Sequence, residues 1–146
     1  MQHDSGVTLV EILAVLAILG IAVSVAVVQF RPLQAPLDTA TSQVEGLCRE
    51  ARLSAIASTS AYRLSPDGHG GIKAEHAASC SSTTWTLDSR MGLTLPNGVS
   101  MTPSSWTACF SSRGISSSGL TIALTHSQYG TRSVEILVGG TTRVLK

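Results

Sequence analysis

The hydrophobic pattern begins with one long apolar run. Residues 7–28 are apolar or glycine, with the exceptions of Thr8, Glu11 and Ser24. At 1.5 Å per residue, a helix of this length is long enough to span a bilayer. The run therefore predicts a membrane-spanning helix that carries one carboxylate near its start.

A second periodic segment follows Pro32 and Pro36. Because proline interrupts helical hydrogen bonding, this region predicts a kink or a short break. Beyond it, apolar residues recur every three or four positions and charged residues occupy the other faces. The apolar positions are Leu37, Ala40, Val44, Leu47, Ala51 and Ala55. This spacing predicts an amphipathic helix that ends near residues 58–60 and packs one face on the domain behind it.

From residue 61 onward, short β-type runs alternate with Gly, Pro, Asn and Ser. Such punctuation is typical of strands joined by turns. The predicted strands are residues 61–64, 71–76, 84–87, 106–110, 120–124, 133–138 and 141–145. Helix followed by strands predicts an α+β fold, in which the amphipathic helix packs on a small antiparallel sheet.

The last two predicted strands form the clearest hairpin. Gly139 and Gly140 predict a two-residue turn of type I′ or II′ between them. In the strand before it, Val134, Ile136 and Val138 alternate with other residues, which predicts one buried face.

Charge does not point to a nucleic-acid partner. The chain has 146 residues, enough for one ordinary domain, and a net charge of +1. The part from Arg31 onward holds all ten Lys and Arg and seven of the nine acidic residues, a net charge of +3. This is no strong electrostatic footprint for a polyanion.

Three cysteines, Cys48, Cys80 and Cys109, show no zinc-ligand spacing. Outside the cytoplasm, one disulfide and one spare thiol is the natural count. Cys80 and Cys109 both fall in the strand-rich half, which favours the pair Cys80–Cys109. Three buried free thiols remain the alternative, since connectivity does not follow from sequence alone.

Glu11 is the unusual residue of the apolar run. A charged side chain near the centre of a membrane helix costs about 2.5–3.5 kcal/mol, and somewhat less toward one end. Beside an ammonium group in a low dielectric, the same carboxylate becomes part of a strongly attractive pair. The next cation along the chain is Arg31. We therefore expect the partner to be an N-terminal amine, or a cation of another chain; a Glu that reaches the membrane interface is the alternative.

Residues Gly6-Val7-Thr8-Leu9-Val10-Glu11, with the apolar run behind them, resemble the class III leader junction of type IV pilins and type II secretion pseudopilins. The resemblance implies that a prepilin peptidase cuts between Gly6 and Val7 and methylates the amine of Val7. It implies that Glu11 accepts the N-terminal amine of a neighbouring subunit. Val7 stands where Phe is commonest in the family, and residues 1–6 lack the usual basic residue.

The resemblance also implies a domain organisation. Residues 1–6 would be the leader peptide, 7–30 the transmembrane half of the helix, 31–60 its amphipathic extension and 61–146 an extracytoplasmic β-rich domain. The expected location is the bacterial inner membrane, with a single pass. The expected partners are the prepilin peptidase, other pilin or pseudopilin subunits and the inner-membrane assembly platform.

A second resemblance lies in the C-terminal half. Residues 109–114, 119–122 and 143–144, with residues 51–56 late in the helix, resemble the GspH/FimT group of minor pseudopilins and minor pilins. The function implied is that of a structural subunit of a type II secretion pseudopilus or a type IV pilus. A signal-anchored protein that never polymerises is a further alternative, distinguished by the absence of a cut after Gly6.

The alternative from another functional class is a DNA-binding minor pilin on the same scaffold. Some relatives in the resembled group bind DNA through basic residues of the C-terminal region. The candidates here are Arg113, Arg132, Arg143 and Lys146, with Trp106 for base stacking. Scattered solvated charges are the competing interpretation, and Trp85 and Trp106 are interpreted as packing residues.

No motif indicates catalysis or a cofactor. His3, His69, His76 and His126 have no Cys or carboxylate at ligand spacing. The serines form no Gly-x-Ser-x-Gly elbow, and the glycines around His69 do not match a phosphate-binding loop. We expect neither enzyme activity nor a bound metal or cofactor.

Overall fold

The computed structural model describes residues 9–29 and 36–145, and for residues 21–29 it describes the backbone alone. The chain divides into two units, residues 1–33 and 34–146. Over the described residues, no helix combines the length and the hydropathy of a bilayer span. The predicted leader, the predicted break at Pro32, and Lys146 lie outside the described residues.

The first unit contains helix α1, Leu9–Gln29. Over residues 9–20, its large apolar side chains have exposed fractions of 51–75%. They are Leu9, Val10, Ile12, Leu13, Val15, Leu16, Ile18 and Leu19. A helix that is apolar all round needs apolar surroundings, either lipid or other helices, to cover it.

The second unit begins with helix α2, Pro36–Ala57. Pro36 occupies the start, where its missing N–H costs no hydrogen bond, and Asp38 lies in the first turn, where the helix dipole favours an acidic side chain. At the other end, Ser60 N donates to Ala55 O at 3.1 Å and Thr59 N donates to Ile56 O at 3.3 Å. This is a Schellman motif, with Thr59 at a φ of 53° in the position where glycine is usual. The helix therefore ends close to the predicted 58–60.

Over the described residues that follow α2, the chain forms eight strands. They are β1 Ala61–Pro66, β2 Gly71–Ala77, β3 Thr86–Thr94, β4 Val99–Thr102, β5 Ala108–Phe110, β6 Leu120–His126, β7 Gly130–Ile136 and β8 Thr142–Leu145. All strand pairs are antiparallel. They form two four-stranded sheets, with the orders β3-β2-β1-β5 and β4-β6-β7-β8. The predicted α+β fold is confirmed, with its strands divided between two sheets.

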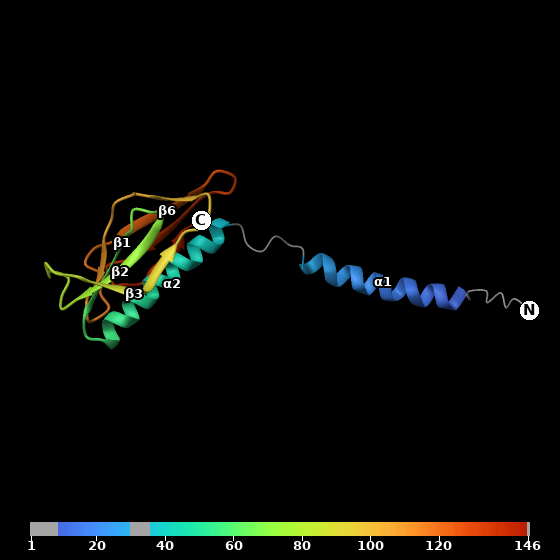
Figure 1. The fold of residues 1–146 in the computed structure, drawn as a ribbon, viewed down its shortest axis with the longest axis horizontal. Helices are drawn as coiled ribbons and strands as arrows, with labels where there is room; N and C mark the ends of the chain where they lie inside the picture. Colours follow the sequence, from blue (N-terminus) through green and yellow to red (C-terminus); the bar gives the residue numbers. More distant parts are fainter. Residues whose placement is uncertain (1–8, 30–35, 146) are drawn as a thin grey trace, which may run out of the picture. The chain divides into compact units, whose positions relative to one another are not determined.

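Helix α2 lies along the sheets (Figure 1) and contacts strands of both. All six of its predicted apolar positions are buried, together with Cys48 and Thr41. One core cluster joins them to the inward faces of the sheets. Its fully buried strand residues include Leu64, Phe110, Ile122, Leu124, Val134 and Ile136.

The β7–β8 hairpin differs from the prediction. β7 ends at Ile136, and Val138 is 58% exposed rather than buried. Leu137 N donates to Thr141 O at 2.9 Å, and Gly140 N donates to Leu137 O at 2.7 Å, so three residues rather than two form the connection. Gly140 has a φ of 77°, as the last residue of a three-residue hairpin loop requires.

Replacing Gly140 by alanine is expected to lower the free energy of unfolding by about 1–3 kcal/mol. Besides the strained φ, a Cβ there would overlap the carbonyl oxygen of Gly114. Gly139→Ala is the matched control, because a Cβ at Gly139 meets nothing within 4 Å. Chemical denaturation followed by tryptophan fluorescence measures both variants. Equal stability of the two would contradict the loop geometry described here.

Candidate functional site

The first candidate site is the start of α1. Glu11 lies in the first turn of this helix, where the dipole favours a negative charge. It is followed by apolar side chains that the isolated chain leaves exposed. Gly6 and Val7, the predicted cleavage and methylation positions, lie outside the described residues. Those two roles, and that of Glu11, stay predictions.

The second candidate feature is the disulfide. Cys80 and Cys109 are bonded, with an S–S distance of 2.01 Å and a Cα–Cα distance of 5.9 Å. The bond ties the loop after β2 to β5. Cys48 is a free, buried cysteine. Burial, with a smaller contribution from the charge of Glu45, raises the pKa of the Cys48 thiol to about 12, so this thiol is a poor nucleophile.

A charged cluster lies next to the disulfide, on the face of the first sheet opposite its core residues. Arg63 of β1 stands in register with Glu75 on one side and Cys109 on the other. Arg63 donates to Glu75 Oε2 from Nη2 at 2.8 Å and from Nε at 3.1 Å. The guanidinium also lies 4.2 Å from the ring centroid of Trp85, a cation–π contact. Trp85 is thus a packing residue of this cluster.

Glu75 is held ionised by this cluster. Burial raises its pKa, but the hydrogen bond and charge of Arg63, and the charge of Lys73, outweigh burial and bring the pKa below its ordinary value of 4.5. A lowered folded-state pKa stabilises the protein above the unfolded-state value, and the contribution is lost as the pH falls through the folded value.

Glu75→Gln is expected to lower the free energy of unfolding by about 1–2 kcal/mol at pH 7, because it removes a charge-assisted hydrogen bond from a pair that is only 12% and 28% exposed. The difference from wild type should shrink as the pH falls below 4.5 and through the lowered folded-state pKa of Glu75, where the wild-type carboxylate becomes protonated. Denaturation curves between pH 3 and pH 7 measure this. Glu45→Gln, which breaks an exposed ion pair at 3.6 Å on α2, should change stability by less than about 0.5 kcal/mol. A pH-independent difference for Glu75→Gln would contradict the ion pair.

Two of the predicted DNA-contacting residues, Arg132 and Arg143, do not come together. Arg132 of β7 pairs with Asp38 of α2 at 2.8 Å, on the face that packs against the helix. Arg143 of β8 pairs with Glu135, which it opposes in register. Because Glu135 neighbours the buried Val134 and Ile136, its side chain and that of Arg143 lie on the opposite face. The two arginines thus occupy different faces of one sheet, each beside an acidic partner.

The other members of that predicted set differ in their surroundings. Arg113 is exposed, within the turn that Gly114 N closes by donating to Ser111 O. Trp106 is 7% exposed, and its Nε1 donates to Met101 Sδ at 3.3 Å, so it packs in the core rather than offering a face to a base. Lys146 lies outside the described residues.

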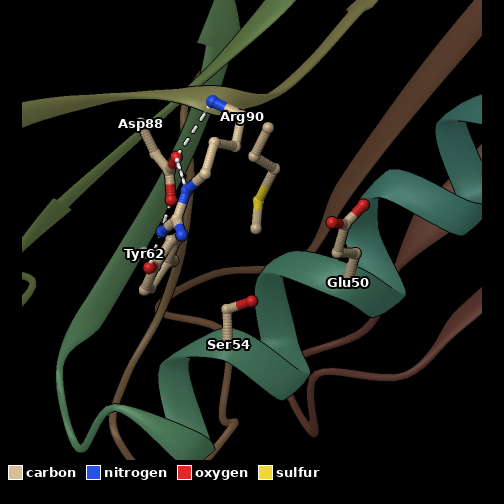
Figure 2. A pocket seen from close by; sticks show the side chains of 6 residues that line it. Glu50, Ser54, Tyr62, Asp88 and Arg90 are labelled. Carbon is tan, nitrogen blue, oxygen red and sulfur yellow. Dashed lines mark hydrogen bonds and ion pairs between the residues drawn. The ribbon is translucent and has the colours of Figure 1, made fainter.

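Sequence reasoning missed a polar pocket of about 310 Å³ between α2 and the first sheet. In Figure 2, Glu50 and Ser54 of the helix face Tyr62, Asp88 and Arg90 of the strands. Asp88 accepts hydrogen bonds from Arg90 N at 3.1 Å and from Tyr62 Oη at 3.4 Å. The only sequence signal was the Asp-x-Arg spacing on what proved to be one strand.

The polar groups of this pocket form hydrogen bonds with one another. Hydrogen bonds from the backbone and side chain of Arg90 lower the pKa of Asp88, so this carboxylate is ionised near neutral pH and is a weak general base. Among the described residues, no three His, Cys, Asp or Glu side chains gather as a metal site would require. His69 and His76 lie apart, in a loop and on β2 respectively.

Comparisons with known proteins agree with this fold. Residues 1–27 match the family described as the prokaryotic N-terminal methylation motif. The type IV minor pilin FimU of Pseudomonas aeruginosa has a similar structure, with 15% identity, a TM-score of 0.58, and coverage of 75% of this chain and 88% of that one. The minor pseudopilin EpsH of the type 2 secretion system of Vibrio cholerae is similar, with 14% identity, a TM-score of 0.58, and coverage of 76% and 97%. No curated protein sequence matches the chain.

The resemblance drawn from residues 6–11 and from the C-terminal half is therefore confirmed at two levels. The N-terminal segment carries the prokaryotic N-terminal methylation motif. The domain has the fold of minor pilins and minor pseudopilins.

Proposed function

We propose that this chain is a minor pilin or minor pseudopilin, a structural subunit of a type IV pilus or a type II secretion pseudopilus. The observation that carries the proposal is the methylation motif over residues 1–27 in a chain whose domain shares the fold of FimU and EpsH. The charged clusters of the domain form ion pairs that stabilise the fold, which suits a subunit without enzyme activity.

Assembly would depend on α1. Its apolar surface suits the bacterial inner membrane before assembly and a bundle of sister helices afterwards. Apolar matching alone selects no single register along such a bundle, whereas one charge pair does. Glu11 would supply that pair by accepting the N-terminal amine of Val7 of a neighbouring subunit. The prepilin peptidase would first have to expose this amine by cutting after Gly6.

The proposed organisation follows from this role. Residues 1–6 are the leader, 7–30 cross the inner membrane once, 31–60 extend the helix, and 61–146 form the extracytoplasmic domain. An oxidising compartment outside the cytoplasm suits the bond between Cys80 and Cys109. The partners are the prepilin peptidase, sister subunits and the assembly platform.

The described basic residues of the domain do not favour DNA uptake over assembly. Two of the four basic residues on which that alternative depends, Arg132 and Arg143, are engaged by Asp38 and Glu135. A nucleic-acid backbone requires a row of available cations on one face.

A deletion strain complemented with the wild-type gene tests the proposal. Secretion of hydrolases, surface pili and uptake of labelled DNA are scored side by side. Loss of secretion assigns the subunit to a secretion pseudopilus, and loss of pili assigns it to a type IV pilus. If DNA uptake alone is lost while pili and secretion are normal, the assembly role is wrong.

A further inference from the structure

A second pocket, of about 220 Å³, lies between α2 and the β7–β8 hairpin. Its lining residues are Arg49, Arg52, Gly140, Thr141 and Thr142. It therefore combines two guanidinium groups with two threonines, which are hydroxyl donors. This composition is that of a site for an oxyanion.

Arg52 is the central residue of this pocket. Its Nε is buried and has no hydrogen-bond partner among the described residues. The side chain is confined by backbone, since a Cβ at Gly114 or Gly140 would stand 3.1 or 3.3 Å from that nitrogen. A buried guanidinium donor without an acceptor is costly, so an acceptor brought by another molecule would be bound favourably.

Arg49 is available to the same ligand. Its contact with Glu45 is 3.6 Å long, and its side chain is 71% exposed. An exposed ion pair one helical turn apart contributes only a few tenths of a kcal/mol. Turning Arg49 from Glu45 toward a bound anion therefore costs little.

The residues near the pocket indicate whether the anion comes from a protein side chain or from a nucleic-acid phosphate. Three exposed apolar side chains lie near this end of α2, namely Ile56, Ile115 and Val138, at 45%, 47% and 58% exposure. Gly114 brings the Ile115 turn against Ile56, and Ser116 N donates to Val138 O at 3.1 Å. Exposed apolar side chains beside an arginine pocket are typical of a protein interface, where apolar residues and arginine are enriched, and not of a surface that binds a phosphate backbone.

We propose that the pocket of Arg49, Arg52 and the Gly140–Thr142 segment binds a carboxylate side chain of a neighbouring protein chain. The planar guanidinium of Arg52 matches a carboxylate with two parallel hydrogen bonds. The identity of the neighbour as a filament subunit rests on the proposed function; the carboxylate chemistry of the pocket does not.

The test uses the full chain in detergent micelles, with ¹⁵N-labelled arginine. N-acetyl-glutamate N-methylamide is the probe, and the matching glutamine compound is the neutral control. The Nε–H resonance of Arg52 should shift saturably with the glutamate compound and not with the glutamine one. Arg49→Gln should weaken the affinity on the order of 10-fold, while Arg143→Gln should leave it within about 2-fold.

Three results would overturn the proposal. One is an Arg52 resonance that does not respond to the glutamate compound, and another is an equal response to glutamine. The third is saturation by a single-stranded oligonucleotide at micromolar concentration without a response to glutamate, which would reassign the pocket to nucleic acid. Carboxylate binding by a chain that never enters filaments would uphold the pocket and contradict the proposed function instead.

Discussion

Replacing Glu11 by glutamine is expected to reduce incorporation of this chain into filaments on the order of 100-fold. In the variant, the N-terminal ammonium of the neighbouring subunit would lie among apolar helices without its counter-charge. A lone charge inside a membrane helix costs roughly 2.5–3.5 kcal/mol, which corresponds to this ratio. Glutamine keeps the size and the hydrogen-bonding capacity of the side chain but removes its charge. The loss therefore reports the charge pair with an N-terminal amine rather than the shape of the helix.

The measurement is the amount of each variant in sheared or overproduced filaments, relative to the amount in the membrane fraction. Leader removal should be unchanged, because Glu11 lies five residues from the cut after Gly6. Glu11→Asp is the matched control, since it keeps the charge, and it should retain much of the incorporation. Normal incorporation of Glu11→Gln would show that the carboxylate does not set the register.

Removing the disulfide with the double variant Cys80→Ser, Cys109→Ser is expected to lower the free energy of unfolding by about 3–4 kcal/mol. The bond closes a loop between residues 29 positions apart, and its loss frees that loop in the unfolded chain. Denaturant titration of the full chain, followed by the fluorescence of Trp85 and Trp106, measures the change.

A reductant is the control for this experiment. It should destabilise the wild type by a similar amount and leave the double variant unchanged. Cys48 is the same in both proteins, and in the folded state its buried thiol, with a pKa of about 12, is a poor nucleophile. Denatured without reductant, the wild type should show one reactive thiol, and three would contradict the disulfide.

Helix α2 was predictable because its signals are local. The apolar spacing from Leu37 to Ala55 identified the buried face, and every predicted position is buried. Pro36 marked the start of the helix. Such signals need no knowledge of the rest of the fold.

The strands were predictable in direction but less so in number and extent. β3 runs over Thr86–Thr94, whereas the pattern predicted only residues 84–87. In β3 the buried positions are Asp88 and Met91, three residues apart, so the period-two pattern of a strand is absent. Pairing with β2, with a register shift between Lys73 and Glu75, defines this strand.

The β7–β8 hairpin shows how an error of one residue in the length of a predicted turn changes a predicted site. A two-residue turn at Gly139 and Gly140 would set Arg143 opposite Ile136, on the same face as Arg132. The observed three-residue connection sets Arg143 opposite Glu135 instead. A register shift of one residue transfers every side chain of the strand to the other face, so Arg143 does not share the face of Arg132.

The two candidate sites also differ in how far the sequence alone could predict them. The motif from Gly6 to Glu11 is contiguous and was readable from the sequence. The pocket of Arg49, Arg52 and the Gly140–Thr142 segment joins residues about 90 positions apart. They become neighbours only when the hairpin folds onto α2, and no pattern along the chain announces that contact.

Mass spectrometry of this chain, recovered from purified filaments, tests most directly whether the chain is processed and assembled. We expect a peptide that begins at Val7, with a methyl group on its N-terminal amine. Finding the chain only in membranes, and still beginning at Met1, would contradict the account of a processed and assembled subunit.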